Sequence, residues 1–311
     1  AEAVRVLYPQ YMDMIARQPS LPLQVLYHDR VFDTPVSESD ILGIGLGLAL
    51  KGVVTVAEIQ FHEFANIGMH HIDEAARMLQ RYAGRISIPF VVRMPFGAGE
   101  RIEGHNGDDI RRYFNIPGLI IACPSLVVQD WYDMLLASME AGLPVLFFEH
   151  IDLYRSIHGA VTRRSPSKRI EEFGVRVARE GRHLTIVTYG RMVQLCIEAA
   201  EESARRHGIE ATILDVLVFS PLKKDVIIES VAETGRLLTV EESPKQHGVG
   251  AEFAACVAED PRSFHYLQAP IRRLAGRQCY PPFPRAWKHY IPSVPQIVEA
   301  IEEMLEIPRT G

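Results

Sequence analysis

Short apolar runs alternate with longer segments of helical periodicity along most of the chain. At the start, Val4 to Ala16 has apolar residues at helical spacing, which predicts a helix that ends in the segment from Arg17 to Pro22. The apolar runs that follow are rich in β-branched and aromatic residues, as is typical of buried strands. In the first half of the chain we expect strands at 23–27, 53–61, 88–93, 119–122 and 144–149, with helices at 67–82 and 127–141 between them.

Residues 154–182 interrupt this pattern because they are polar and rich in Arg, Ser and Gly. A second alternation follows, with strands expected at 184–188, 211–217, 236–240 and 271–274 and helices between them. The last predicted helix begins with the capping-box pattern Ser293-Val294-Pro295-Gln296. The sequence therefore predicts an α/β fold of two tandem domains, 1–160 and 183–311, joined by a linker at 161–182. We expect a mostly parallel sheet in the first domain.

The segment from Asp33 to Asp40 leads into a run of small apolar residues at 41–50. Pro35 fixes one backbone angle and biases the residue before it toward an extended conformation, so the strand-like entry stops there. Ser37 is a predicted N-cap, and the run beyond it is typical of a buried helix that starts with Glu38. Glu38 has two interpretations: a carboxylate that complements the helix dipole, or an acid–base group held where a cleft meets a dry core.

The composition is that of an ordinary globular protein long enough for two cores, with 311 residues, 47% hydrophobic and 23% charged. The net charge of -6 argues against a general nucleic-acid-binding surface. The cysteines are isolated from one another and form no CxxC pattern, so we expect a reducing compartment and neither a zinc site nor a disulfide framework. Without a transmembrane run or a signal-peptide pattern, the expected location is cytoplasmic, or the mitochondrial matrix for a processed eukaryotic chain.

The chain contains no familiar nucleotide-binding or phosphate-binding motif. The glycines of Gly43-Ile44-Gly45-Leu46-Gly47 lack the spacing of a dinucleotide fingerprint, and close helix packing explains them better. Gly107-Asp108-Asp109 is not the GDG-plus-Asn pattern that carries a Mg²⁺-diphosphate, and neither a Walker A sequence nor a nucleophile elbow occurs. We therefore expect no phosphate cradle and no metal ligands in this chain.

Two groups of residues after predicted strands are candidates for binding or catalysis. His105 lies in a long glycine-rich loop, from Pro95 to Asp109, at the carboxyl side of a strand, where ligands bind in such sheets. The alternative is an exposed loop histidine without a function. Phe61 and Phe64 follow the strand that ends near Gln60, and by default they are core aromatics.

A set of motifs that follow one another along residues 31–305 resembles the beta subunit of thiamine-diphosphate-dependent 2-oxoacid dehydrogenases, of the transketolase-like superfamily. In the first half these motifs are Phe32-Asp33-Thr34-Pro35-Val36-Ser37-Glu38, Ala57-Glu58-Ile59-Gln60-Phe61, Arg93-Met94-Pro95-Phe96-Gly97, Pro117-Gly118-Leu119 and Phe147-Phe148-Glu149. In the second half they are Thr188-Tyr189-Gly190, Asp215, Ser220-Pro221-Leu222, Thr234-Gly235-Arg236, Val240-Glu241-Glu242, Gly248-Val249-Gly250-Ala251-Glu252 and Pro292-Ser293-Val294.

The resemblance implies a pyrimidine-binding first domain and a transketolase-type C-terminal domain. It also implies an α₂β₂ heterotetramer, whose alpha subunit supplies the Mg²⁺-diphosphate motif that this chain lacks. Such a tetramer decarboxylates a 2-oxo acid, pyruvate or a branched-chain one, on thiamine diphosphate shared between the subunits. It then reductively acylates a lipoyl group on the acyltransferase core of the multienzyme complex.

The resemblance also assigns roles to individual residues of this sequence. Glu38 matches the acid that bonds the far ring nitrogen of the aminopyrimidine, where a carboxylate stabilises the protonated ring as an amide cannot. Phe64 matches the aromatic stacked on the pyrimidine, with Phe61 as the alternative and Gln60 beside it in the expected cofactor-binding set. His105 matches the histidine that faces the substrate and the lipoyl entrance.

The chain departs from the family pattern at two places. The family has a longer N-terminal segment with a strand that ends in Gly-Glu-Asp/Glu-Val, so we expect this first strand to be absent or reduced here. The loop of His105 is shortened and carries Glu100-Arg101-Ile102-Glu103 where the family is mostly glycine. Some members also bind a monovalent cation through carbonyls near Met139 to Leu143.

Two alternatives to the 2-oxoacid dehydrogenase stay open at this point. One keeps the fold and changes the reaction, to acetoin cleavage or to transketolase-like transfer by a split chain. The other is a non-catalytic homologue that binds partners.

Overall fold

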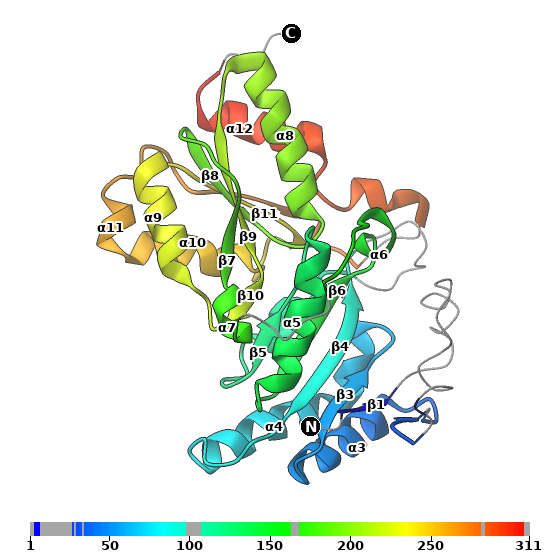
Figure 1. The fold of residues 1–311 in the computed structure, drawn as a ribbon. Coiled ribbons are helices and arrows are strands. Elements are labelled where there is room, and N and C mark those ends of the chain that lie inside the picture. The colour runs from blue at the N-terminus through cyan, green and yellow to red at the C-terminus, as the bar shows by residue number, and fades with distance from the viewer. Residues whose placement is uncertain are drawn as a thin grey trace.

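The computed structural model describes residues 3–6, 27, 29–32, 34–97, 107–162, 168–280 and 284–307. These residues form two α/β domains, each built on its own sheet, and the second domain lies above the first in Figure 1. The predicted class, two tandem α/β domains with a mostly parallel first sheet, is confirmed.

The first sheet has the strand order β10-β5-β6-β4-β3-β1-β2, and all neighbours are parallel except β10 and β5. Its strands are β1 (Ala3–Val6), β2 (Val31–Phe32), β3 (Val54–Glu58), β4 (Phe90–Phe96), β5 (Ile120–Ala122), β6 (Val145–His150) and β10 (Val218–Ser220). Strands β3 to β6 lie where the buried apolar runs predict them. Because these strands are parallel, their carboxyl ends meet at one edge of the sheet, which is where ligands bind in such folds.

Helices cover both faces of the first sheet. One face carries α3 (Glu38–Leu50), the 3-10 helix η1 (His62–Gly68) and α4 (Met69–Arg81), and the other carries α5 (Val128–Glu140). Along β4 the side chains alternate between two cores: Phe90 packs under α3, and Val91 packs with residues of α5. The N-cap predicted at Ser37 is confirmed, because its side chain accepts a hydrogen bond from Asp40 N at 3.3 Å.

The second sheet has the order β12-β11-β8-β9-β7 and is parallel except for β7. Its strands are β7 (Val175–Arg179), β8 (Leu184–Thr188), β9 (Ala211–Val216), β11 (Leu237–Pro244) and β12 (Arg272–Gly276). Around it lie α8 (Met192–His207), α9 (Lys224–Thr234), α10 (Gly250–Glu259) and α12 (Val294–Met304), the last with the predicted capping box. Short helices complete the chain: η2 (Ile110–Tyr113), α6 (Leu153–Ser156), α7 (Ile170–Phe173), α11 (Pro261–Phe264) and η3 (Pro284–His289). Among the described helices, none has the length and apolar composition of a membrane span.

The two domains share a strand and a hydrophobic core. Strand β10 comes from the second half of the chain but lies at the edge of the first sheet, antiparallel to β5. One buried core runs from the first sheet into the second domain: the ring of Tyr189 packs edge-on against Phe219 at 5.0 Å, and Phe219 contacts Phe114 of the first half. The domains are therefore joined across a buried interface as well as through the chain between them.

The N-terminus and the segment between the domains differ from the sequence-based expectation. Residues Ala3–Val6 form a short strand β1, parallel to both β3 and β2, so the helix predicted from Val4 is wrong for these residues. Pairing with the buried β3 outweighs the local helical spacing. The rest of that predicted helix, and the strand at 23–27 except Tyr27, lie outside the described residues. The range 161–182 contains α7 and β7, and β7 is already an edge strand of the second sheet.

The glycines of α3 give a matched pair of substitutions. A Cβ at Gly45 would lie 2.7 Å from the Phe90 ring, whereas a Cβ at Gly47 would meet no atom within 4 Å. We expect Gly45→Ala to lower the free energy of unfolding by about 1–3 kcal/mol through overpacking. Gly47→Ala should raise it by about 0.5–1 kcal/mol because alanine is the better helix former. Urea denaturation of the two variants measures both values, and a stabilising Gly45→Ala would contradict this account of the packing.

Candidate active site

A buried ion-pair cluster joins three adjacent parallel strands of the first sheet. Arg93 of β4 donates to Glu58 of β3 at 3.0 Å and to both carboxylate oxygens of Glu149 of β6 at 2.7 and 2.9 Å. The side chains of Arg93, Glu58 and Glu149 are 11%, 8% and 5% exposed. Burial alone lowers the pKa of Arg93, but the two carboxylates outweigh it and raise the pKa above its ordinary value. Arg93 therefore stays charged. Its ion pairs link β4 to β3 and β6 near the edge of the sheet where the segments with predicted site residues begin.

Glu38 is the first residue of α3 and is half-buried. Its side chain makes no hydrogen bond or ion pair with any described residue. Helix α3 packs closely on η1 at this point, because a Cβ on Gly68 would lie 2.6 Å from Leu42 and 3.1 Å from the carbonyl oxygen of Glu38. The start of α3 and the end of η1 are therefore in direct contact, as a shared binding wall requires.

The predicted aromatic residues lie on that neighbouring segment. Gln60 and Phe61 lie between the end of β3 and the start of η1, and Phe64 lies within η1. The Phe61 and Phe64 rings form an edge-to-face pair with centroids 5.2 Å apart, and Phe64 packs partly buried against the main core. Gln60, Phe61 and Phe64 are all half-buried, so the structure brings the predicted pyrimidine-binding residues onto two packed elements. Their contact with a cofactor stays a prediction.

His105 lies outside the described residues, as does the acidic segment around it, so its predicted role stays a prediction. The two ends of this segment are described: Gly97 follows β4, and Gly107 precedes η2. The Gly97 amide donates to the Gly107 carbonyl at 3.3 Å. The segment that carries His105 therefore leaves and returns at one point on the carboxyl edge of the first sheet.

Beside this segment the structure shows two polar pairs that the sequence analysis did not predict, although Tyr189 and Glu242 lie in motifs that carry the family resemblance. His150, at the end of β6, bonds Glu242 of β11 at 2.9 Å, and both are almost fully buried. Since Nδ1 of His150 accepts from Asp152 N at 3.3 Å, Nε2 carries the proton and donates to Glu242. Tyr189, which follows β8, donates its hydroxyl to Asp108. Each pair joins residues more than eighty positions apart, so no local pattern could indicate them.

Asp108 is a buried carboxyl with an unusual affinity for its proton. Burial raises its pKa to about 8, the hydrogen bond from Tyr189 opposes this shift, and the nearby carboxylates of Glu242 and Glu241 add to it. The residue is 2% exposed. Near neutral pH Asp108 is therefore mostly protonated and can serve as a hydrogen-bonding group without carrying a charge.

A second buried cluster between the domains is structural. Arg176 of β7 donates to Asp215 of β9 at 2.7 Å and also pairs with Asp130 of α5, and Ser125 donates to Asp215. Asp215 is fully buried; burial raises its pKa, and the charge of Arg176 opposes the rise. This cluster joins the first domain to the second on the side of α5.

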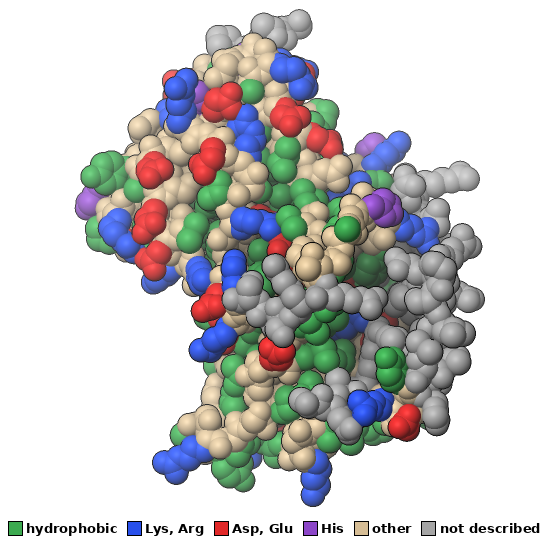
Figure 2. All heavy atoms as spheres, viewed as in Figure 1, with side chains coloured by type: hydrophobic (Ala, Val, Ile, Leu, Met, Phe, Trp, Pro, Cys, Tyr) green, Lys and Arg blue, Asp and Glu red, His purple; other side chains and the backbone are tan. Residues whose placement is uncertain are grey.

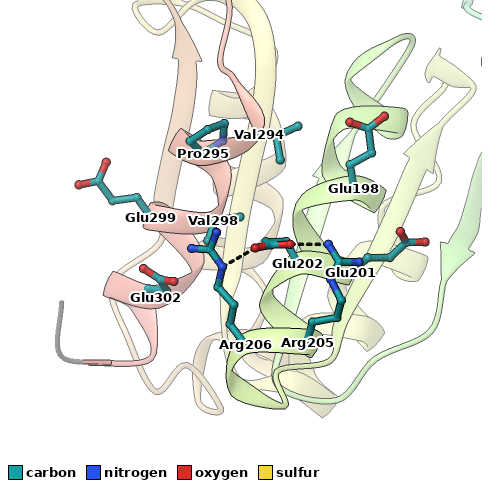
Figure 3. Close-up of a pocket in the computed structure, with 10 residues that line it drawn as sticks. All are labelled: Glu198, Glu201, Glu202, Arg205, Arg206, Val294, Pro295, Val298, Glu299 and Glu302. Atoms are coloured by element: carbon teal, nitrogen blue, oxygen red, sulfur yellow. Dashed lines mark hydrogen bonds and ion pairs between the residues drawn. The ribbon is translucent and has the colours of Figure 1, made fainter. Parts of the chain in front are cut away.

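One hollow on the described surface lies far from these residues. It is a groove between α8 and α12, at the opposite end of the molecule from α3 (Figures 1 and 3). Acidic side chains line it, and Arg205 and Arg206 both turn back to pair with Glu202. The groove therefore holds no part of the predicted site. Among the described residues, no group of three or more His, Cys, Asp or Glu side chains is arranged to hold a metal ion.

The raised pKa of Asp108 predicts a pH-dependent stability. In the unfolded chain the carboxyl ionises near pH 4, but in the folded protein it holds its proton to about pH 8, so unfolding releases a proton between these values. The free energy of unfolding should therefore fall as pH rises from 4 to 8, by at most about 1.4 kcal/mol per pH unit. The Asn side chain in Asp108→Asn cannot titrate. The Tm of this variant minus the Tm of the natural chain should therefore increase from pH 4 to pH 8 and level off above pH 8.

Thermal melts at pH 5, 6.5, 8 and 9 measure this difference. Asp109→Asn is the matched control, because Asp109 is half-buried and bonds Arg111 and Arg112. A Tm difference for Asp108→Asn that stays constant with pH would show that Asp108 does not hold its proton.

Comparisons with known proteins agree with this architecture. Residues 6–156 match the model of the transketolase pyrimidine-binding domain, and residues 174–297 match that of the transketolase C-terminal domain. The chain is 37% identical over 280 residues to the pyruvate dehydrogenase E1 component subunit beta of Bacillus subtilis, covering 89% of this chain and 84% of that one. It is 35% identical, with the same coverage, to the protein of that name from Staphylococcus epidermidis.

Among solved structures, the fold is shared with a split gene transketolase described as an inactive beta4 tetramer. The TM-score is 0.71 at 20% identity, and the match covers 99% of this chain and 93% of that one. This likeness shows the fold, whereas the sequence identities above show the family. The chain belongs to the transketolase-like family of 2-oxoacid dehydrogenase E1 beta subunits.

Proposed function

We propose that this chain is the beta subunit of a decarboxylating 2-oxoacid dehydrogenase component that works with an alpha subunit. The pair would decarboxylate a 2-oxo acid on thiamine diphosphate and reductively acylate a lipoyl group of an acyltransferase core. The names of the relatives favour pyruvate over a branched-chain acid. The observation that carries the proposal is Glu38, a half-buried carboxylate at the start of α3 with no partner among the described residues.

The residues around Glu38 fit the aminopyrimidine end of the cofactor. A carboxylate with no partner among the described residues can hold a proton at a ring nitrogen, and Phe64 of the adjoining η1, or Phe61 just before it, offers an aromatic face. When bound, thiamine diphosphate supplies an acidic thiazolium carbon that attacks the 2-oxo group once it is deprotonated. Glu38 would favour that deprotonation by holding the proton on the ring, and His105 would act on the substrate side.

The surface beside Glu38 supports the proposed alpha subunit. Helix α3 is apolar all round, and such helices are normally buried on every side. In this structure Ile44 of α3 is 47% exposed, Val36 just before the helix is 75% exposed, and Ile67 of η1 is 70% exposed. Figure 2, which looks onto the α5 side of the first sheet, shows charged side chains crowded over the second domain and more apolar surface on the first. In the proposal, the alpha subunit covers the surface of Val36, Ile44 and Ile67 and brings the Mg²⁺-diphosphate motif to the ring that Glu38 holds.

A monovalent cation near Met139 to Leu143 stays part of the proposal. The Gly142 carbonyl of this turn already accepts hydrogen bonds from Ile88 N at 2.9 Å and from Ser87 Oγ at 3.0 Å. Its neighbours along the turn would have to supply the carbonyl ligands.

The test of the proposal is Glu38→Ala in the chain assembled with its alpha subunit. Removal of the carboxylate should lower cofactor-dependent turnover of the 2-oxo acid by at least about 100-fold, the usual contribution of a positioned acid–base group. Asp40→Ala is the control, because Asp40 lies in the same helical turn but is exposed. Turnover that survives Glu38→Ala would remove the proposed role.

Two further assays separate the alternatives. A panel of 2-oxo acids, acetoin and sugar phosphates distinguishes the dehydrogenase from an acetoin-cleaving or split transketolase-like enzyme. Calorimetric titration of the assembled pair with thiamine diphosphate distinguishes both from a non-catalytic homologue, which should show no saturable binding.

A further inference from the structure

Two buried hydrogen bonds cross from the first domain to the second beneath the ends of the segment between β4 and η2. They are His150 Nε2 to Glu242, at 2.9 Å, and the Tyr189 hydroxyl to Asp108. We call these two pairs the clasp. From the first domain, His150 is the last residue of β6 and Asp108 lies just before η2. From the second domain, Glu242 lies within β11 and Tyr189 directly follows β8. All four residues are at most 2% exposed, and an unmatched donor or acceptor is costly at such buried positions.

The backbone of both domains closes on the imidazole of His150. Gly97 has a φ of +93°, and a Cβ there would lie 2.2 Å from Nε2 of His150. Gly190, with a φ of +56°, approaches the same ring from the second domain, and a Cβ there would lie 3.4 Å from Cδ2. Only glycine can bring its backbone this close to the His150 ring at position 97. The start of the segment after β4 therefore packs directly against the clasp.

The far end of that segment also adjoins the clasp. Gly107, whose carbonyl accepts from the Gly97 amide at 3.3 Å, is followed at once by Asp108. Further polar contacts between the domains surround the buried pairs. Asp152 pairs with Arg191, and Arg111 donates to the carbonyl of Gln246 at 2.5 Å. These polar contacts therefore join the second domain to the first next to Gly97 and Gly107, the described ends of the segment that carries His105.

We propose that Tyr189 and Glu242 are positioning residues, through which the C-terminal domain holds Gly97, Gly107 and Asp108 in place on the substrate side of the site. This inference rests on the proposed function for its kinetic consequence. The C-terminal domain thereby contributes to the reaction without touching the cofactor. Loosening the clasp should impair the use of the 2-oxo acid and leave the binding of thiamine diphosphate near Glu38 intact.

The test is Tyr189→Phe in the assembled alpha–beta pair, because this change deletes only the hydroxyl. We expect kcat/KM for the 2-oxo acid to fall by about 10-fold, as misplacement of a site element does. The dissociation constant of thiamine diphosphate should stay within twofold. Hydrogen–deuterium exchange at residues 107–110 should become faster.

Two matched variants separate positioning from general loss of stability. Thr185→Val deletes a buried hydroxyl of β8 whose partners among the described residues are Ser230 and Thr234 of the second domain, so it should change neither kcat/KM nor the exchange. Glu242→Gln keeps an acceptor for His150 and should retain most of the activity. Equal losses in Tyr189→Phe and Thr185→Val, or unchanged exchange in Tyr189→Phe, would overturn the inference. If the natural pair shows no 2-oxo acid turnover, the proposed function fails, and the exchange measurement still tests the clasp.

Discussion

The pairing of Arg93 with Glu58 and Glu149 is the constraint on which the site depends. Burying three charges is tolerable only because each finds an opposite charge at hydrogen-bonding distance. Glu58 and Glu149 lie near the carboxyl ends of β3 and β6, and Arg93 lies in the middle of β4 between them, so the cluster fixes these three strands relative to one another. Residues of the candidate site adjoin all three strands: Gln60 and Phe64 follow β3, Gly97 follows β4, and His150 ends β6.

The second domain completes the same edge. Strand β10 extends the first sheet, and a continuous core passes between the domains. Two separate polar clusters stabilise the contact: Arg176 with Asp130 and Asp215 beside α5, and the clasp beside Gly97 and Gly107. Such an interface resembles the interior of a single domain more than the loose contact between mobile domains. The geometry at the carboxyl edge is thus set by both halves of the chain.

The sequence predicts those parts of the molecule that depend on local patterns. Buried apolar runs indicate β3 to β6, and the N-cap at Ser37 correctly starts α3 at Glu38, since capping is a contact between near neighbours. The predictions that failed depend on distant contacts. Ala3–Val6 has helical spacing but is a strand because β3 pairs with it, and β10 is too short to show a period. The clasp joins residues 81 and 92 positions apart, which no local pattern reveals.

The central claim is that the Glu38 carboxylate acts on a cofactor ring that the alpha subunit has brought to it. The most direct measurement is the rate of hydrogen–deuterium exchange at the C2 carbon of thiamine diphosphate bound to the assembled pair, because it reports deprotonation without any substrate. Glu38→Gln, which keeps the shape of the side chain but cannot hold the ring proton, should slow this exchange by about 100-fold or more. Equal exchange rates in the natural and Glu38→Gln pairs would contradict the account.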